Sequence, residues 1–138
     1  MEQLTRSELR EKIMTILYQI NVYNINKIEY DVDSVIKEVN PIDNEFVKDI
    51  VYGVITNKEK IDNIANEYLN NWTIDRLGNT DQAIIRMSIY ELLYTKTPEI
   101  VVINEAIELA KSYSDDDVRK MINGMLDKIY RNKEKYEW

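Results

Sequence analysis

Helix-breaking residues are rare in this chain, and their scarcity limits the folds open to it. The 138 residues include three glycines and two prolines, at Gly53, Gly78, Gly124, Pro41 and Pro98. Between these positions apolar residues recur at spacings of three and four, which places them on one face of an α-helix. Residues 99–103 would also suit a strand, but no other segment looks like a partner strand, so helix is preferred. The sequence therefore predicts an all-α fold.

Capping signals indicate where the helices begin. Thr5 with Glu8 three residues later forms a capping box, and Asp43 and Thr80 are expected N-caps. The acids at 115–117 supply a cap and first-turn charges for the last helix. A tight turn is expected at residues 73–78. About seven helices follow, at residues 5–24, 33–39, 43–55, 59–69, 80–97, 99–110 and 115–129.

The length of the chain is typical of one domain. The short connections favour a compact bundle of antiparallel neighbours. We therefore expect a single helical domain over residues 1–138, with an amino-terminal half at 1–71 and a carboxyl-terminal half at 72–138.

The chain contains no cysteine and no histidine. This excludes Cys or His zinc sites, thiol nucleophiles and Ser-His-Asp catalysis. Residues 115–117 lack the alternating ligands of a Ca²⁺ loop, and Glu105 with Glu108 lacks the histidines of a di-iron site. We expect no metal, no cofactor and no enzymatic activity.

The first twelve residues do not resemble a signal peptide, because no basic stretch precedes an apolar run. No stretch approaches the ~20 apolar residues of a membrane span. The sequence thus predicts a cytoplasmic protein that does not enter a membrane.

The net charge of -7 argues against a stand-alone nucleic-acid binder, since Lys and Arg supply most non-specific affinity for phosphate. The charge is unevenly distributed. Residues 29–49 carry seven acids against two lysines, and residues 128–135 carry four bases against one acid. The basic end is open to two interpretations, a frayed helix or a basic tail.

Two helices carry arginines whose positions suggest a specific role. Arg86 lies among isoleucines in the helix expected to be central, and an ion pair with Glu105 on the next helix is the preferred explanation, with ligand contact as the alternative. The first helix carries Arg6 near its start. Beside the apolar face of the same helix lie Arg10 and, eight residues later, Tyr18. Guanidinium and aromatic groups suit single-stranded RNA, although an ordinary solvated face explains them as well.

Several motifs considered together resemble the family of the transcription antitermination factor NusB. The most specific is the run INEAIELAK at 103–111 followed by NGMLD at 123–127. Weaker matches lie at Leu17-Tyr18-Gln19 and at 51–54, so the resemblance spans essentially the whole chain. Further matching segments are Trp72, Asp75-Arg76-Leu77, residues 81–86 and residues 90–93.

The resemblance implies a non-enzymatic, all-helical RNA-binding protein. Members of the family pair with NusE, a small-subunit ribosomal protein, and the heterodimer binds boxA RNA of nascent ribosomal transcripts. The complex joins the RNA polymerase elongation complex with other Nus factors. An alternative is a helical protein-interaction module with little RNA binding of its own. The sequence leaves open whether the free protein is a monomer or a homodimer.

The resemblance also implies site residues. RNA-binding positions carried over from the family are Arg6, Arg10 and Tyr18, with Lys111, Arg119 and Lys120 as weaker ones. Expected contacts with NusE are Asp75, Arg76, Asp81 and Glu91. The chain departs from many relatives at Met121, where an aromatic is common, and Tyr113 is the residue that would compensate. Glu8 interrupts the arginines of the amino terminus, which points to weak RNA affinity in the absence of a partner.

Overall fold

The computed structural model describes residues 3–70 and 72–136, and in these ranges the fold is built from helices with no strand. The all-α prediction is confirmed. The six α-helices and two short 3₁₀ helices of this part are α1 Arg6–Ile25, α2 Val32–Val39, α3 Glu45–Glu67, η1 Ile74–Arg76, α4 Asn79–Tyr94, α5 Glu99–Tyr113, α6 Asp116–Arg131 and η2 Lys133–Lys135. The segment 99–103, for which a strand was the alternative, begins α5.

The described part has one α-helix fewer than expected, because the segments predicted at 43–55 and 59–69 form the single helix α3. The expected break remains as a kink. Asn57 has non-helical angles (φ -107°, ψ 15°), and its side-chain Nδ2 donates to the Gly53 carbonyl at 2.9 Å. This side-chain hydrogen bond competes with the regular backbone ladder, so the helix bends without ending.

The predicted caps are confirmed at two helices and shifted at two others. At α1, Thr5 Oγ1 accepts from the Glu8 amide and Glu8 accepts from the Thr5 amide. These bonds to Thr5 hold the pKa of Glu8 below its ordinary value. Asp115 caps α6 by accepting from Val118.

The predicted caps Asp43 and Thr80 are wrong by one and two residues. Asn44 caps α3, because its Oδ1 accepts from the Val47 amide, while Asp43 pairs with Lys48 instead. At α4 the cap is Gly78, which has no side chain to donate or accept.

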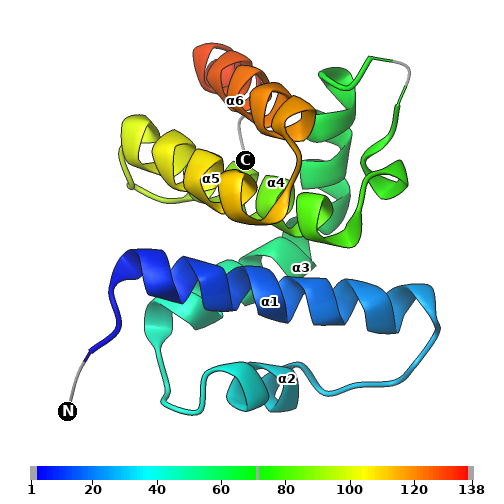
Figure 1. Cartoon of the computed structure of the whole chain (residues 1–138), viewed down its shortest axis with the longest axis vertical. Coiled ribbons are helices and arrows are strands. Elements are labelled where there is room, and N and C mark those ends of the chain that lie inside the picture. The colour runs from blue at the N-terminus through cyan, green and yellow to red at the C-terminus, as the bar shows by residue number, and fades with distance from the viewer. Residues whose placement is uncertain (1–2, 71, 137–138) are drawn as a thin grey trace.

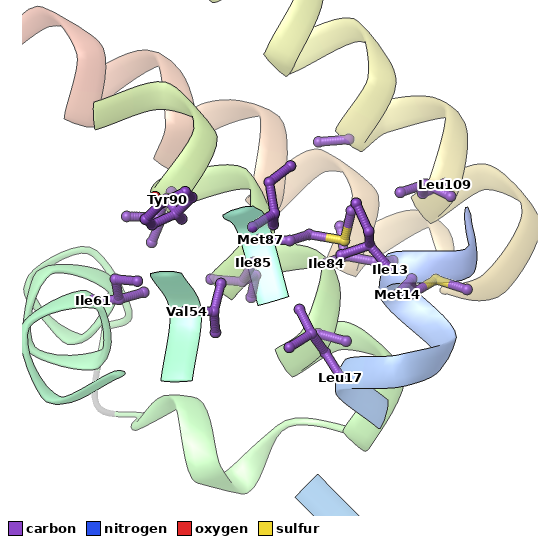
Figure 2. Close-up of a cluster of buried hydrophobic side chains, with 14 of the residues drawn as sticks. Ile13, Met14, Leu17, Val54, Ile61, Ile84, Ile85, Met87, Tyr90 and Leu109 are labelled. Carbon is purple, nitrogen blue, oxygen red and sulfur yellow. The ribbon is translucent and has the colours of Figure 1, made fainter. Parts of the chain in front are cut away.

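Helix α4 is the centre of the fold (Figure 1) and contacts α1, α3, α5 and α6. It is buried on nearly all sides, as expected of a helix that is apolar around its circumference. Figure 2 shows Ile84, Ile85 and Met87 of α4 among side chains from the surrounding helices, with those of Ile13, Met14, Leu17, Val54, Ile61 and Leu109 labelled. This packing surrounds the buried charged residues Arg10, Arg86 and Glu91, which are described below.

A close approach between α3 and α4 requires a glycine. A Cβ atom added to Gly53 would overlap the ring of Tyr90, far inside van der Waals contact. The Tyr90 hydroxyl reaches past Gly53 and donates to Asp49 Oδ1 at 2.9 Å. The small residue therefore lets the two helices pack closely.

None of the described helices is both long enough and apolar enough to cross a membrane. The boundary expected at Asn71 lies outside the described residues. The division into two halves therefore stays a prediction.

Candidate nucleic-acid and partner interface

The amino-terminal end of α1 presents one expected RNA-binding residue at the surface. Arg6 is exposed, and its guanidinium carbon lies 3.9 Å from the centre of the Phe46 ring on α3. No carboxylate among the described residues forms an ion pair with it. The aromatic ring orients the side chain without neutralising its charge.

Arg10 is buried, in contrast to its expected role. It is 4% exposed, and its Nε and Nη2 donate to the two carboxylate oxygens of Glu91 at 2.9 and 2.5 Å. Glu105 lies 3.9 Å away and adds a second negative charge. Burial disfavours the charged form of Arg10, but the bonds and charge of Glu91 outweigh burial and raise its pKa.

This ion pair corrects two expectations at once. Arg10 was expected to contact RNA and Glu91 to contact NusE, yet Glu91 is only 2% exposed. The physical reason is that Arg10 follows the apolar face of α1, which packs against the buried helix α4. A charged group taken into that contact must be paired, and each residue is the partner of the other.

The expected ion pair between Arg86 and Glu105 is also wrong. Arg86 Nε and Nη2 donate to the carboxylate of Asp62 on α3 at 2.8 and 3.1 Å, and Nη1 donates to Asn21 on α1. Glu105 instead accepts from Ser7 at 2.7 Å and approaches Arg10. Because α4 is buried on nearly all sides, its arginine faces α3 and α1, whereas Glu105 of α5 faces the start of α1.

Helices α1 and α5 form a joint surface that carries further expected RNA-binding residues. Tyr18 is 41% exposed on α1. The exposed Tyr113 at the end of α5 donates a hydrogen bond to Glu11 of α1, which raises the pKa of the tyrosine. Lys111 is exposed but pairs with Glu108 at 3.3 Å. The surface therefore mixes aromatic and positive groups with carboxylates.

Helix α6 contributes Arg119 and Lys120. Arg119 is half-buried and pairs with Asp116 at 3.4 Å, and its buried Nε has no hydrogen-bond partner within the described chain. Lys120 is exposed. Met121, the position at which this chain departs from the family pattern, is partly buried against the core.

Three of the four expected partner contacts lie at or near the surface around η1. Asp75 and Arg76 are exposed, and a hydrogen bond from Thr73 lowers the pKa of Asp75. Asp81, in the first turn of α4, accepts from Ser114 between α5 and α6. Trp72, close to this group in the chain, is 57% exposed.

Residues 3–70 and 72–136 contain no group of three or more His, Cys, Asp or Glu side chains that could hold a metal ion. The carboxylates described above are instead bonded to arginine, lysine, hydroxyl or backbone groups.

Sequence reasoning missed the pair of Arg10 and Glu91 although a signal was present. Arg10 adjoins Leu9 on the apolar face, and Glu91 lies between Tyr90 and Leu92 in the helix that was expected to be central. The requirement that a buried arginine be paired holds for Arg10 as it does for Arg86. Asp62 gave no such signal, because it lies in a segment rich in other charged residues.

The fold and this site define a small all-helical protein with a central buried helix and charged groups fixed between helices. The chain belongs to the NusB family, whose family model matches residues 7–131. It is 42% identical over 132 residues to the transcription antitermination protein NusB of Exiguobacterium sp., covering 93% of this chain and 98% of that protein. The corresponding protein of Staphylococcus aureus is 41% identical over 127 residues, covering 91% and 98%.

Solved structures agree with this assignment. The fold is similar to NusB of T. maritima with a TM-score of 0.81 and 30% identity, covering 99% of this chain and all of the other. It is also similar to NusB in a crystal structure of the antitermination factors NusB and NusE in complex with dsRNA. There the TM-score is 0.78 at 28% identity, covering 92% of this chain and 96% of the other.

Proposed function

We propose that this protein is a transcription antitermination factor that binds boxA RNA of nascent ribosomal transcripts together with NusE. The observation that supports this most strongly is its likeness, over 92% of its length, to a NusB chain solved with NusE and RNA. Assembly with other Nus factors on RNA polymerase, a cytoplasmic location and the lack of catalysis are parts of the same proposal.

The RNA-binding surface in this proposal comprises Arg6, Tyr18, Lys111, Arg119 and Lys120. Lys111 and Arg119 are paired with Glu108 and Asp116, so their charges are partly neutralised before RNA arrives. Weak affinity of the protein alone follows from this pairing. Arg10 acts in this proposal as an internal support that holds α1 on α4 through Glu91, and Arg6 is thereby kept in place.

The surface for NusE comprises Asp75, Arg76 and Asp81. Two carboxylates complement a basic partner, which would bring the positive charge that this protein lacks. A homodimer that formed through the RNA-binding surface or the NusE surface would cover that surface. The test of the proposal therefore includes the oligomeric state of the free protein.

A binding measurement tests the proposed function. Labelled boxA RNA and a scrambled RNA of the same composition are titrated with the protein plus NusE, and anisotropy is recorded. Tighter binding of boxA than of the scrambled RNA is expected. Equal binding of the two RNAs would contradict the proposed function, and sedimentation of the free protein would show whether it is a monomer.

A second function, a protein-interaction module with little RNA binding, is favoured by the acid partners of Lys111 and Arg119. A variant combining Arg6→Ala and Lys120→Ala separates the two ideas, because both side chains are exposed and neither forms an ion pair within the described residues. An RNA-binding factor loses RNA affinity and part of its salt dependence while binding of NusE persists. An interaction module shows no change in either.

A further inference from the structure

A pocket lies between the amino-terminal end of α1 and the connection from α2 to α3. Apart from Arg6, none of the residues around it belongs to the binding surfaces proposed above. It has a volume of about 500 Å³ and is lined by Gln3, Leu4, Arg6, Leu9, Asn40, Ile42, Asp43 and Asn44. In Figure 1 the blue amino-terminal end of α1 lies above the connection between α2 and α3. The size is in the range of pockets that bind small organic groups.

Two asparagines give this pocket hydrogen-bonding groups that the fold does not use. Asn40 is only 6% exposed, and its Nδ2 donates to the Ile42 carbonyl at 2.9 Å. Its Oδ1 accepts no hydrogen bond from the described residues. Asn44 caps α3 through its Oδ1, and its Nδ2 donates to no described residue. The pocket thus offers one acceptor and one donor for an external group.

The lining of the pocket combines apolar side chains with polar ones, and Arg6 brings a positive charge to it. Leu4 and Ile42 are exposed, Ile42 to 65%. Arg6 carries a full positive charge on the ring of Phe46 without an ion pair in the described part of the chain. The negative charge of Asp43 is compensated by Lys48. A ligand with flat apolar faces, polar edges and a nearby negative charge would match these features.

We propose that this pocket takes an unstacked nucleobase of single-stranded RNA. A base has donors and acceptors along its edge for the two asparagines, and apolar faces for Leu4 and Ile42. Its phosphate lies within reach of a guanidinium such as Arg6. The inference rests on the proposed function, because the RNA that passes Arg6 on α1 would supply the base.

Two substitutions alter the pocket without removing its structural bonds. Ile42→Glu places a negative charge on an exposed wall. Asn44→Ser keeps an oxygen that caps α3 but removes the donor Nδ2. Ile100→Glu is the matched control, since Ile100 is 64% exposed on α5, outside the pocket, and undergoes the same change in charge. Circular dichroism and thermal unfolding check that all three variants fold.

Affinity for boxA RNA is measured in the presence of NusE, with RNAs in which each nucleotide in turn is abasic. The wild type should lose affinity by about tenfold at one position, the usual effect of one lost base contact. Ile42→Glu and Asn44→Ser should bind intact RNA about tenfold more weakly and be insensitive to the abasic change at that position. Ile100→Glu should behave as the wild type.

The outcomes separate this inference from the proposed function. If wild-type protein binds boxA RNA but both pocket variants keep the full abasic profile, the inference is overturned and the function stands. If the variants lose NusE binding instead of RNA binding, the pocket serves the protein partner and the inference is again wrong. Failure of the wild type to bind boxA RNA at all would overturn both.

Discussion

At the scale of single residues, the pair of Arg10 and Glu91 shows how buried charge can organise this fold. The exposed fractions of the two side chains are 5% and 3%, and two hydrogen bonds join them. Removing Arg10 leaves Glu91 buried without its counter-charge, and removing Glu91 leaves Arg10 with only the more distant Glu105, whereas removing both leaves neither buried charge. The pair therefore joins α1 to α4 at a point where the sequence suggested two separate binding residues.

The first prediction concerns this pair. Glu91→Gln should lower the free energy of unfolding by about 3 kcal/mol, because the buried Arg10 loses its nearest counter-charge and keeps only Glu105 at 3.9 Å. Urea unfolding measures the change. Glu108→Gln, which breaks an exposed pair with Lys111, should cost about 1 kcal/mol or less. A double variant with Met at positions 10 and 91 should be more stable than Glu91→Gln, and a double variant of lower stability would contradict this account.

The glycines allow a second prediction. Gly53→Ala should destabilise the protein by about 1 to 3 kcal/mol, because the new methyl group overlaps the Tyr90 ring. Gly124 lies in α6, and a methyl group at this position would have no neighbour within 4 Å, so Gly124→Ala should stabilise by about 0.5 to 1 kcal/mol. Thermal unfolding of both variants checks these opposite signs, and a loss of stability in both would refute the close-approach argument.

At the scale of elements, α4 carries two stacked tyrosines near its end. Tyr90 and Tyr94 lie with ring centres 4.9 Å apart, and burial raises the pKa of each from 10.0 to about 12. A group with a raised pKa stabilises the folded state below its unfolded pKa, and this stabilisation disappears as the pH rises through the folded pKa. The free energy of unfolding should therefore fall between about pH 10 and pH 12.

Tyr94→Phe provides the third prediction. The variant has one ionisable group fewer, so its free energy of unfolding should fall less steeply over that pH range than that of the wild type. Denaturant unfolding at several pH values from about 8 to about 11.5 gives both slopes. Identical slopes would show that Tyr94 titrates normally in the folded protein.

The helices were predictable where neighbouring residues in the sequence determine them. They were less predictable where contacts between distant parts of the chain determine them. The capping box at Thr5 predicted the start of α1 to within one residue, and the apolar faces predicted the extents of α1 and α6 closely. Periodicity does not reveal that the two predicted helices continue as α3 through a kink at Asn57. The partner of Arg86 depends on which side of α4 faces α3, and only the packed molecule defines that side. Arg10 and Glu91 were expected to contact RNA and NusE, and the packed molecule shows both side chains buried against each other.

At the scale of the whole molecule, the net charge of -7 points to shared binding of RNA. Each phosphate neutralised on a single strand contributes about -0.7 to the slope of log affinity against log salt. With a basic partner present, more phosphates are neutralised than by this protein alone. The slope should accordingly be steeper for the heterodimer, and a salt series from low to physiological ionic strength measures it.

The central claim is that this protein binds boxA RNA tightly only together with a basic partner. One titration tests this claim most directly. Labelled boxA RNA is titrated with the protein alone, with NusE alone and with both at one salt concentration. The account predicts that the pair binds at least about tenfold more tightly than either component. Equal affinity of the protein with and without NusE would contradict it.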